Sequence, residues 1–80
     1  MQVEVRRFAS LVREGVPGRA GEPAQVELPP SATIDDLLET LELRREEVHL
    51  VMVNGRTVSC GDHVLGDGDR VGLFPPVGGG

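Results

Sequence analysis

Lysine is absent from the sequence, and all eight basic residues are arginine. The chain therefore offers no side-chain amine to an acylating agent, and only its N-terminus could be acylated by a copy of itself. Genome composition alone would account for the absence, but the chemical consequence is the same. The formal net charge of −5 argues against nucleic-acid binding, because a phosphate backbone demands a basic surface.

Cysteine and aromatic residues are nearly absent. Cys60 is the only cysteine, so the chain has no intramolecular disulfide framework. Phe8 and Phe74 are the only aromatic residues, so the core has to be built from valine, leucine and isoleucine. No apolar stretch approaches the length of a membrane span, and the N-terminus lacks a signal-peptide pattern. We therefore expect a cytoplasmic protein that does not bind membranes.

The chain is also too short for a large substrate cleft. Its 80 residues make a single domain, with an expected radius of gyration of about 12 Å. No acid–base pair or nucleophile–histidine arrangement stands out in the sequence. We therefore assign no catalytic side chain and expect a carrier or binding module, not an enzyme.

The first third of the chain predicts a hairpin. Gln2–Phe8 alternates between apolar and polar side chains, as in a half-buried strand. Residues 8–14 could continue as a short helical turn, and residues 15–21 form a glycine-rich loop. Gln25–Leu28 is a second short strand, closed by Pro29-Pro30, which cannot continue a hydrogen-bonded ladder.

The clearest helix begins after Thr33. The Thr33 hydroxyl can cap the first free amides, and Asp36 completes a capping box with Asp in place of Glu. We expect this helix to fade between residues 42 and 45. Its apolar face follows the i, i+3, i+4, i+7 spacing of a buried stripe, formed by Ile34, Leu37, Leu38 and Leu41.

Three strands are predicted in the second half. Val48–Val53 is nearly continuous in apolar residues, as in a central strand covered on both faces. Asn54-Gly55 is a strong hairpin signal, because a type I′ turn needs positive φ at both positions, and Arg56–Val58 is the return strand. Asp67–Asp69 is a tight turn, and Arg70–Phe74 is the last strand.

This order of elements describes an α+β domain over residues 1–74. One main helix packed across a mixed sheet of four to five strands is the two-layer arrangement that buries the helix stripe in so short a chain. The arrangement is the β-grasp, or ubiquitin-like, fold.

Residues 75–80 are predicted to form an extended, flexible tail. Its two prolines limit the conformations lost on docking, its valine can act as an anchor, and its glycines can thread a narrow channel. Six extended residues reach roughly 20 Å. A folded core has no use for three terminal glycines, so we infer that the body presents the carboxylate of Gly80 to other proteins. The residues predicted to thread into a partner are Pro75, Pro76, Val77, Gly78 and Gly79.

At this point the sequence resembles the ubiquitin-like sulfur carriers, and among them the small subunit of molybdopterin synthase. The resemblance spans nearly the whole chain, and its most specific part is the run from Asp67 through Phe-Pro-Pro-Val to a terminal Gly-Gly. The related carriers for thiamine synthesis are usually shorter and lack the Pro-Pro step. Two features depart from the pattern: a third glycine at Gly78, and a loop at 15–24 that matches no motif. The resembling stretches are Gln25–Leu28, Thr33–Leu38, Val53–Gly55 and Leu65–Gly80.

The resemblance implies a chemical role for Gly80. An ATP-dependent, E1-like adenylating enzyme would activate its carboxylate, and a sulfur donor such as a cysteine desulfurase or rhodanese would then leave a thiocarboxylate. The thiocarboxylate would donate sulfur in molybdopterin (molybdenum cofactor) biosynthesis, in complex with the large catalytic subunit of molybdopterin synthase. The chain itself would bind no cofactor, and its partner would consume the ATP.

Other functions stay open on the sequence. The same activated tail would suit a ubiquitin-like protein modifier, or a sulfur carrier for thiamine, tRNA thiolation or cysteine synthesis. A β-grasp interaction domain with an inert tail is a further alternative. We expect partners to dock on the solvent side of the sheet beside the last strand, with Phe74 and Arg56 as candidate interface residues.

The remaining candidate sites are weaker. Cys60 and His63 have C-x-x-H spacing, but a structural zinc site needs four ligands and His49 is the only other histidine. No metal site is therefore expected, and Asp67–Asp69 is read as a turn, not a calcium loop. The acidic stretch 35–47 is interpreted as a solvated helix face, with a docking surface for a basic partner as the alternative.

Overall fold

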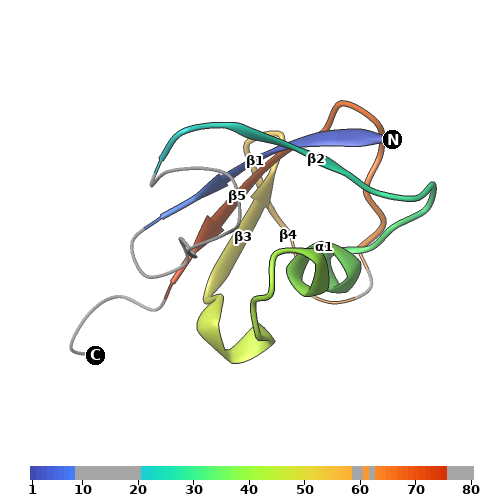
Figure 1. Ribbon diagram of the computed structural model, residues 1–80. Helices are drawn as coiled ribbons and strands as arrows, with labels where there is room; N and C mark the ends of the chain where they lie inside the picture. Colours follow the sequence, from blue (N-terminus) through green and yellow to red (C-terminus); the bar gives the residue numbers. More distant parts are fainter. Residues whose placement is uncertain (9–20, 59–60, 62, 76–80) are drawn as a thin grey trace.

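The computed structural model describes residues 1–8, 21–58, 61 and 63–75 (Figure 1). The predicted order of strand, strand, helix, strand, strand, strand is confirmed, and a short 3₁₀ helix is added before the third strand. The Cα radius of gyration is 11.4 Å, close to the expected value. The elements are β1 (Gln2–Arg7), β2 (Ala24–Glu27), α1 (Ile34–Thr40), η2 (Arg45–Glu47), β3 (Leu50–Val53), β4 (Arg56–Val58) and β5 (Arg70–Phe74).

The five strands form one mixed sheet in the order β2-β1-β5-β3-β4. β1 and β5 pair in parallel at its centre, with Val5 opposite Val71. The other neighbours pair antiparallel, so the sheet consists of the hairpins β1–β2 and β3–β4 joined through β5. Figure 1 shows α1 lying across this sheet. The arrangement is the β-grasp that the sequence predicted.

The capping box predicted at the start of α1 is present. The Asp36 amide donates to the Thr33 hydroxyl at 3.2 Å, and the Thr33 amide donates to the Asp36 carboxylate at 2.8 Å. The next two amides, of Ile34 and Asp35, donate to backbone carbonyls of the segment that precedes β5, at 3.0 and 3.1 Å. These bonds fix the helix against the sheet. The predicted stripe is buried, with Ile34, Leu37, Leu38 and Leu41 each at most 2% exposed.

The end of α1 corrects the sequence prediction. The helix does not fade between residues 42 and 45 but stops at Thr40. Glu42 takes a φ of +59°, so that its amide donates to the Glu39 carbonyl at 3.1 Å and the Leu43 amide donates to the Leu38 carbonyl at 2.9 Å. This is a Schellman motif, which normally carries glycine at the position of Glu42. Because that glycine is missing, no residue here signals the end of the helix.

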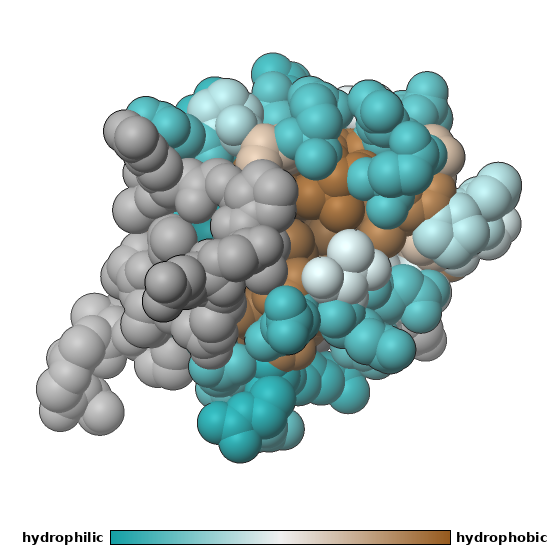
Figure 2. Space-filling view, in the orientation of Figure 1, coloured by the Kyte–Doolittle hydropathy of each residue, from teal (hydrophilic) through white to brown (hydrophobic). Residues whose placement is uncertain are grey.

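The core is aliphatic, as the scarcity of aromatic residues predicted. Figure 2 shows hydrophobic surface gathered in the centre of the view, over the region between β2 and α1 in Figure 1. Half-buried Met1, Val26 and Val58 pack against the buried cluster. Within the described part of the chain, no helix has the length and apolar character needed to cross a membrane. The buried hydrophobic residues are Val3, Val5, Leu28, Ala32, Ile34, Leu37, Leu38, Leu41, Leu43, Val48, Val51, Val53, Leu65, Val71 and Leu73.

β3 also differs from its prediction. Val51 and Val53 are buried, but Leu50 and Met52 are only half-buried, so the strand is not covered on both faces. A continuous apolar run is typical of central strands in parallel sheets with helices on both sides. Here α1 covers one face only, and the alternate residues of β3 contribute to the opposite face.

The turns at one end of the sheet are joined by side-chain hydrogen bonds. Asn54 and Gly55 have φ of +52° and +83°, as the predicted type I′ turn requires. The Asn54 side-chain amide donates to one Asp69 carboxylate oxygen at 3.0 Å, and the Gly66 amide donates to the other at 2.7 Å. The Arg70 amide donates to the Asn54 side-chain carbonyl at 2.9 Å. The residues Asp67–Asp69 therefore form the predicted turn.

Several predicted features lie outside the described residues. They are the helical turn after Phe8, the loop at 15–20, Cys60 and the tail residues Pro76, Val77, Gly78, Gly79 and Gly80. β5 ends at Phe74, the last residue of the predicted body, and Pro75 is the last residue described.

Leu37→Ala is expected to lower the free energy of unfolding by ~2–5 kcal/mol, because it opens a cavity at a fully buried position. Urea denaturation of the purified protein measures the change. The control is Val64→Ala, where the side chain is 57% exposed and the change should stay within about 0.5 kcal/mol. Equal effects at both positions would contradict the assignment of Leu37 to the core.

Candidate functional site

The face of the sheet opposite α1 carries a shallow hollow beside the end of β5. Strand alternation sends Val5, Val71 and Leu73 into the core, so their neighbours point to the other face. The hollow has a volume of about 320 Å³. We call this surface the open face. The hollow is lined by Glu4, Arg6, Phe8, Met52, Gly55, Arg70, Val71, Gly72 and Phe74.

The two aromatic residues of the chain meet on the open face. The rings of Phe8 and Phe74 stack with centroids 4.6 Å apart and planes 6° from parallel. The parallel register of β1 and β5 brings the two rings together. Arg7 lies opposite Leu73, so the next residues, Phe8 and Phe74, also lie opposite each other. The Phe8 amide donates to the Leu73 carbonyl at 3.3 Å. Stacked aromatic pairs add ~0.5–1.5 kcal/mol beyond the area that they bury.

Gly72 makes room for the Phe74 ring. A Cβ atom at Gly72 would lie 3.2 Å from Cε1 and 3.5 Å from Cζ of Phe74. The ring therefore leans back over bare backbone of its own strand. This glycine is not needed for an unusual φ; its role is the close approach of an aromatic ring.

The rim of the open face is more basic than the protein as a whole. Arg6 Nε lies 3.8 Å from a Glu4 carboxylate oxygen, and Arg70 is the strand partner of Glu4. Two arginines thus stand beside one acid at the edge of the hollow. By contrast, Asp35, Asp36 and Glu39 are exposed on α1. The two sides of the sheet layer therefore differ in charge.

The structure separates the two residues predicted for the interface. Phe74 is half-buried on the open face, where Pro75 follows it directly. Arg56 pairs with buried Val53 and so belongs to the face that carries α1. It lines a different hollow, of about 430 Å³, together with His63. The two candidates therefore do not share one surface.

Sequence reasoning missed Phe8 and Gly72 as parts of this site. Phe8 was predicted as the last residue of the first strand and the first of a following turn, with no contact to the end of the chain, whereas its ring stacks on Phe74 at the end of β5. The available signal was the fold itself, because a β-grasp pairs the first and last strands in parallel. Among the described residues, no group of three or more His, Cys, Asp or Glu side chains is placed to hold a metal ion.

The chain is similar to known proteins in sequence and in structure. The ThiS family matches residues 15–80. Small archaeal modifier protein 1 (SAMP1) from Haloferax volcanii has a TM-score of 0.70 and 26% identity, with 100% of both chains covered. A comparison with curated protein sequences gave no match.

Two further solved structures are named for molybdopterin-converting factors. The putative subunit 1 from Pyrococcus furiosus has a TM-score of 0.66 and 36% identity, covering 95% of this chain and 98% of that chain. A chain in the complex of subunits 1 and 2 from Helicobacter pylori 26695 has a TM-score of 0.64 and 25% identity, covering 100% of both.

Gly72→Val is expected to displace the Phe74 ring, because the added side chain occupies the space that the ring now fills. The ring protons of Phe8 and Phe74 should lose their mutual ring-current shifts in NMR spectra, while the strands persist because valine favours β-structure. The control is Thr57→Val, which adds the same side chain to β4 on the open face. Unchanged ring shifts in Gly72→Val would contradict the geometry described here.

Proposed function

The chain belongs to the ThiS family of ubiquitin-like sulfur carriers, and from this membership we propose that it carries sulfur as a thiocarboxylate on Gly80. The observation that carries the proposal is the continuity of β5 with the tail. The strand ends at Phe74 on the open face, and six residues that end in three glycines follow it. The folded body thus holds the base of the tail, and the tail carries the chemistry.

The proposed reaction activates a carboxylate that is otherwise unreactive. A C-terminal carboxyl group has a pKa of about 3.3–3.7 and is ionised at neutral pH, so it resists nucleophiles. A partner enzyme transfers AMP from ATP to the Gly80 carboxylate and releases pyrophosphate. A hydrosulfide supplied by the donor then attacks the carbonyl carbon, the bond to AMP breaks, a proton goes to solvent, and a thiocarboxylate remains. A persulfide donor would first give an acyl disulfide, which a thiol reductant would cleave to the same thiocarboxylate. In this scheme the chain is a co-substrate that binds no cofactor of its own.

The open face is the proposed docking surface for these partners. Phe8 and Phe74 offer a half-buried apolar contact immediately beside Pro75, so a partner that receives the tail meets this face first. Arg6 and Arg70 at its rim favour a partner surface that carries carboxylates around an apolar contact. The stiff Pro75-Pro76 step lowers the entropy lost when the tail is bound.

Molybdopterin synthesis is the pathway that we propose for the sulfur. Its support is the similarity to subunit 1 of the Pyrococcus furiosus factor and to a chain in the Helicobacter pylori complex of subunits 1 and 2. The partner in that pathway would be the large catalytic subunit, and the location would be the cytoplasm. Other sulfur-transfer pathways would use the same tail.

Protein modification is the second candidate function. The similarity to small archaeal modifier protein 1 supports it. Both functions need an activated Gly80, and they differ only in the group that attacks it: a sulfur donor in one case, a protein amine in the other.

Incubation with the activating enzyme, ATP and a sulfur donor is expected to raise the intact mass by the difference between sulfur and oxygen. The chain without Gly79 and Gly80 should gain nothing, because it no longer ends in Gly-Gly and its terminus lies two residues short of the activating site. Covalent adducts through Gly80 to other proteins would favour the modifier instead. If the full chain and the truncated chain both stay unchanged in mass, the proposed function is wrong.

Phe74→Ala is expected to weaken binding of the activating enzyme or of the large subunit by about tenfold or more, as for truncation of a central aromatic contact. Arg56→Ala is the matched control, because Arg56 lies on the other face of the sheet. Calorimetry or surface plasmon resonance measures both constants. A stronger effect from Arg56 than from Phe74 would move the docking surface to the side of α1.

A further inference from the structure

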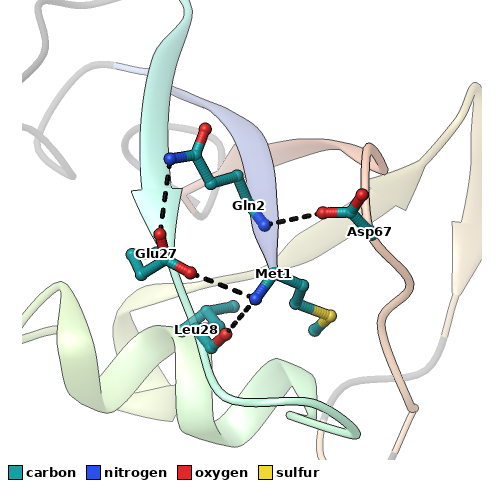
Figure 3. Close-up of polar contacts among 5 residues, drawn as sticks. All are labelled: Met1, Gln2, Glu27, Leu28 and Asp67. Carbon is teal, nitrogen blue, oxygen red and sulfur yellow. Dashed lines mark hydrogen bonds and ion pairs between the residues drawn. The ribbon is translucent and has the colours of Figure 1, made fainter.

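The α-amine of Met1 takes part in a polar network at the opposite end of the sheet from Pro75. Its ammonium donates to a Glu27 carboxylate oxygen at 3.1 Å and to the Leu28 carbonyl at 2.8 Å. Figure 3 shows both acceptors beside the nitrogen, at the end of β2. Two of its three N–H donors are thus engaged by one neighbouring segment.

The residues around this amine are fixed by further hydrogen bonds. The Leu28 amide donates back to the Met1 carbonyl at 2.8 Å. The Gln2 amide donates to the Asp67 carboxylate at 2.8 Å, and the Gln2 side chain donates to Glu27 at 3.3 Å (Figure 3). Turning the Met1 amine outward breaks its two hydrogen bonds, while the bonds of Gln2 and of the Leu28 amide hold the surrounding backbone in place.

Glu27 meets the amine in its charged form. The hydrogen bond from the Met1 ammonium, followed by the hydrogen bond from the Gln2 side chain, lowers the pKa of the Glu27 carboxyl below its ordinary value. The carboxylate is therefore ionised at neutral pH, and the contact is an ion pair.

This amine is also the only one in the 80-residue chain, because the sequence contains no lysine. We propose that, in this 80-residue chain, the Met1 amine held by Glu27 and Leu28 is a poor acceptor for the activated Gly80 of a second copy, so that two copies are not joined by an amide bond. The proposal rests on the activation of Gly80 proposed above. It applies equally to a sulfur carrier and to a protein modifier.

Acylation of the Met1 amine would break contacts that the amine makes with Glu27 and Leu28. In that reaction the nitrogen lone pair attacks the Gly80 carbonyl carbon, a C–N bond forms, the bond to the leaving group breaks, and a proton goes to solvent. The product amide keeps one N–H and no charge. It therefore loses the ion pair with Glu27 and at least one of the two hydrogen bonds.

The tail also cannot close on its own N-terminus. β1 and β5 run parallel, so Met1 lies at the starting end of the sheet and Pro75 at the finishing end (Figure 1). The seven steps from Met1 to Phe8 span about 23 Å at ~3.3 Å per residue. The six residues from Pro75 reach roughly 20 Å when fully extended, and they would have to turn back first.

The test uses the 80-residue chain with a thioester at Gly80, which stands in for the activated carboxyl group and needs no enzyme. At pH 8, intact mass spectrometry follows the amide dimer that links Gly80 of one copy to Met1 of another. The comparison chain carries Gly-Ser-Gly-Ser before Met1, which moves the amine into solvent. The native chain is expected to dimerise at least about tenfold more slowly than the extended chain, because two hydrogen bonds of its amine must break first.

Glu27→Ala separates the ion pair from the rest of the network. It is expected to raise dimerisation of the native chain about two- to fivefold, the range for loss of an exposed ion pair. Glu39→Ala is the matched control, since it removes the same charge from an exposed position on α1. Added free glycine must consume the thioester at equal rates in all variants, which shows that the electrophile is intact.

Dimers of the native chain that form as fast as those of the extended chain would overturn the proposal. Equal rates for Glu27→Ala and Glu39→Ala would overturn the role of Glu27. Neither result depends on the activating enzyme. If the proposed function is wrong, a different experiment shows it, because the enzyme then fails to adenylate Gly80.

Discussion

The parallel pairing of β1 with β5 is the contact on which the rest of the structure depends. It puts Val5 beside Val71 beneath α1 and completes the core that the helix covers. The same register puts Phe8 beside Phe74 on the opposite face. One ladder therefore builds both the core and the candidate docking face. Its direction also puts Phe74 and Pro75 at the opposite end of the sheet from Met1.

The sequence predicted most of the fold because its signals there are local. The capping box at Thr33, the aliphatic stripe of α1 and the Asn54-Gly55 turn each depend on a few neighbouring residues. The end of α1 was missed because Glu42 adopts the left-handed conformation that glycine usually supplies. The energetic cost of this conformation is offset by the burial of Leu43 and by the backbone hydrogen bonds that close the turn. A pattern of neighbouring residues does not show that burial.

The candidate site was less predictable, because it depends on residues distant in sequence. Phe8 and Phe74 lie at opposite ends of the chain, and only the topology brings them together. The apolar run 48–53 predicted a strand covered on both faces, whereas Leu50 and Met52 are only half-buried and lie on the open face. Arg56 was grouped with Phe74, although a two-residue turn after Val53 fixes the register that sends it to the other side.

The central position of β5 has a consequence for quality control. Without this strand the sheet separates into two hairpins that share no backbone bond, and isolated hairpins are at best marginally stable in water. A chain cut short before β5 thus loses its folded body along with its tail. The Phe8–Phe74 stack forms only when β5 is present and paired with β1. A partner that binds this stack would therefore bind only chains that extend at least to the end of β5, without contacting the tail.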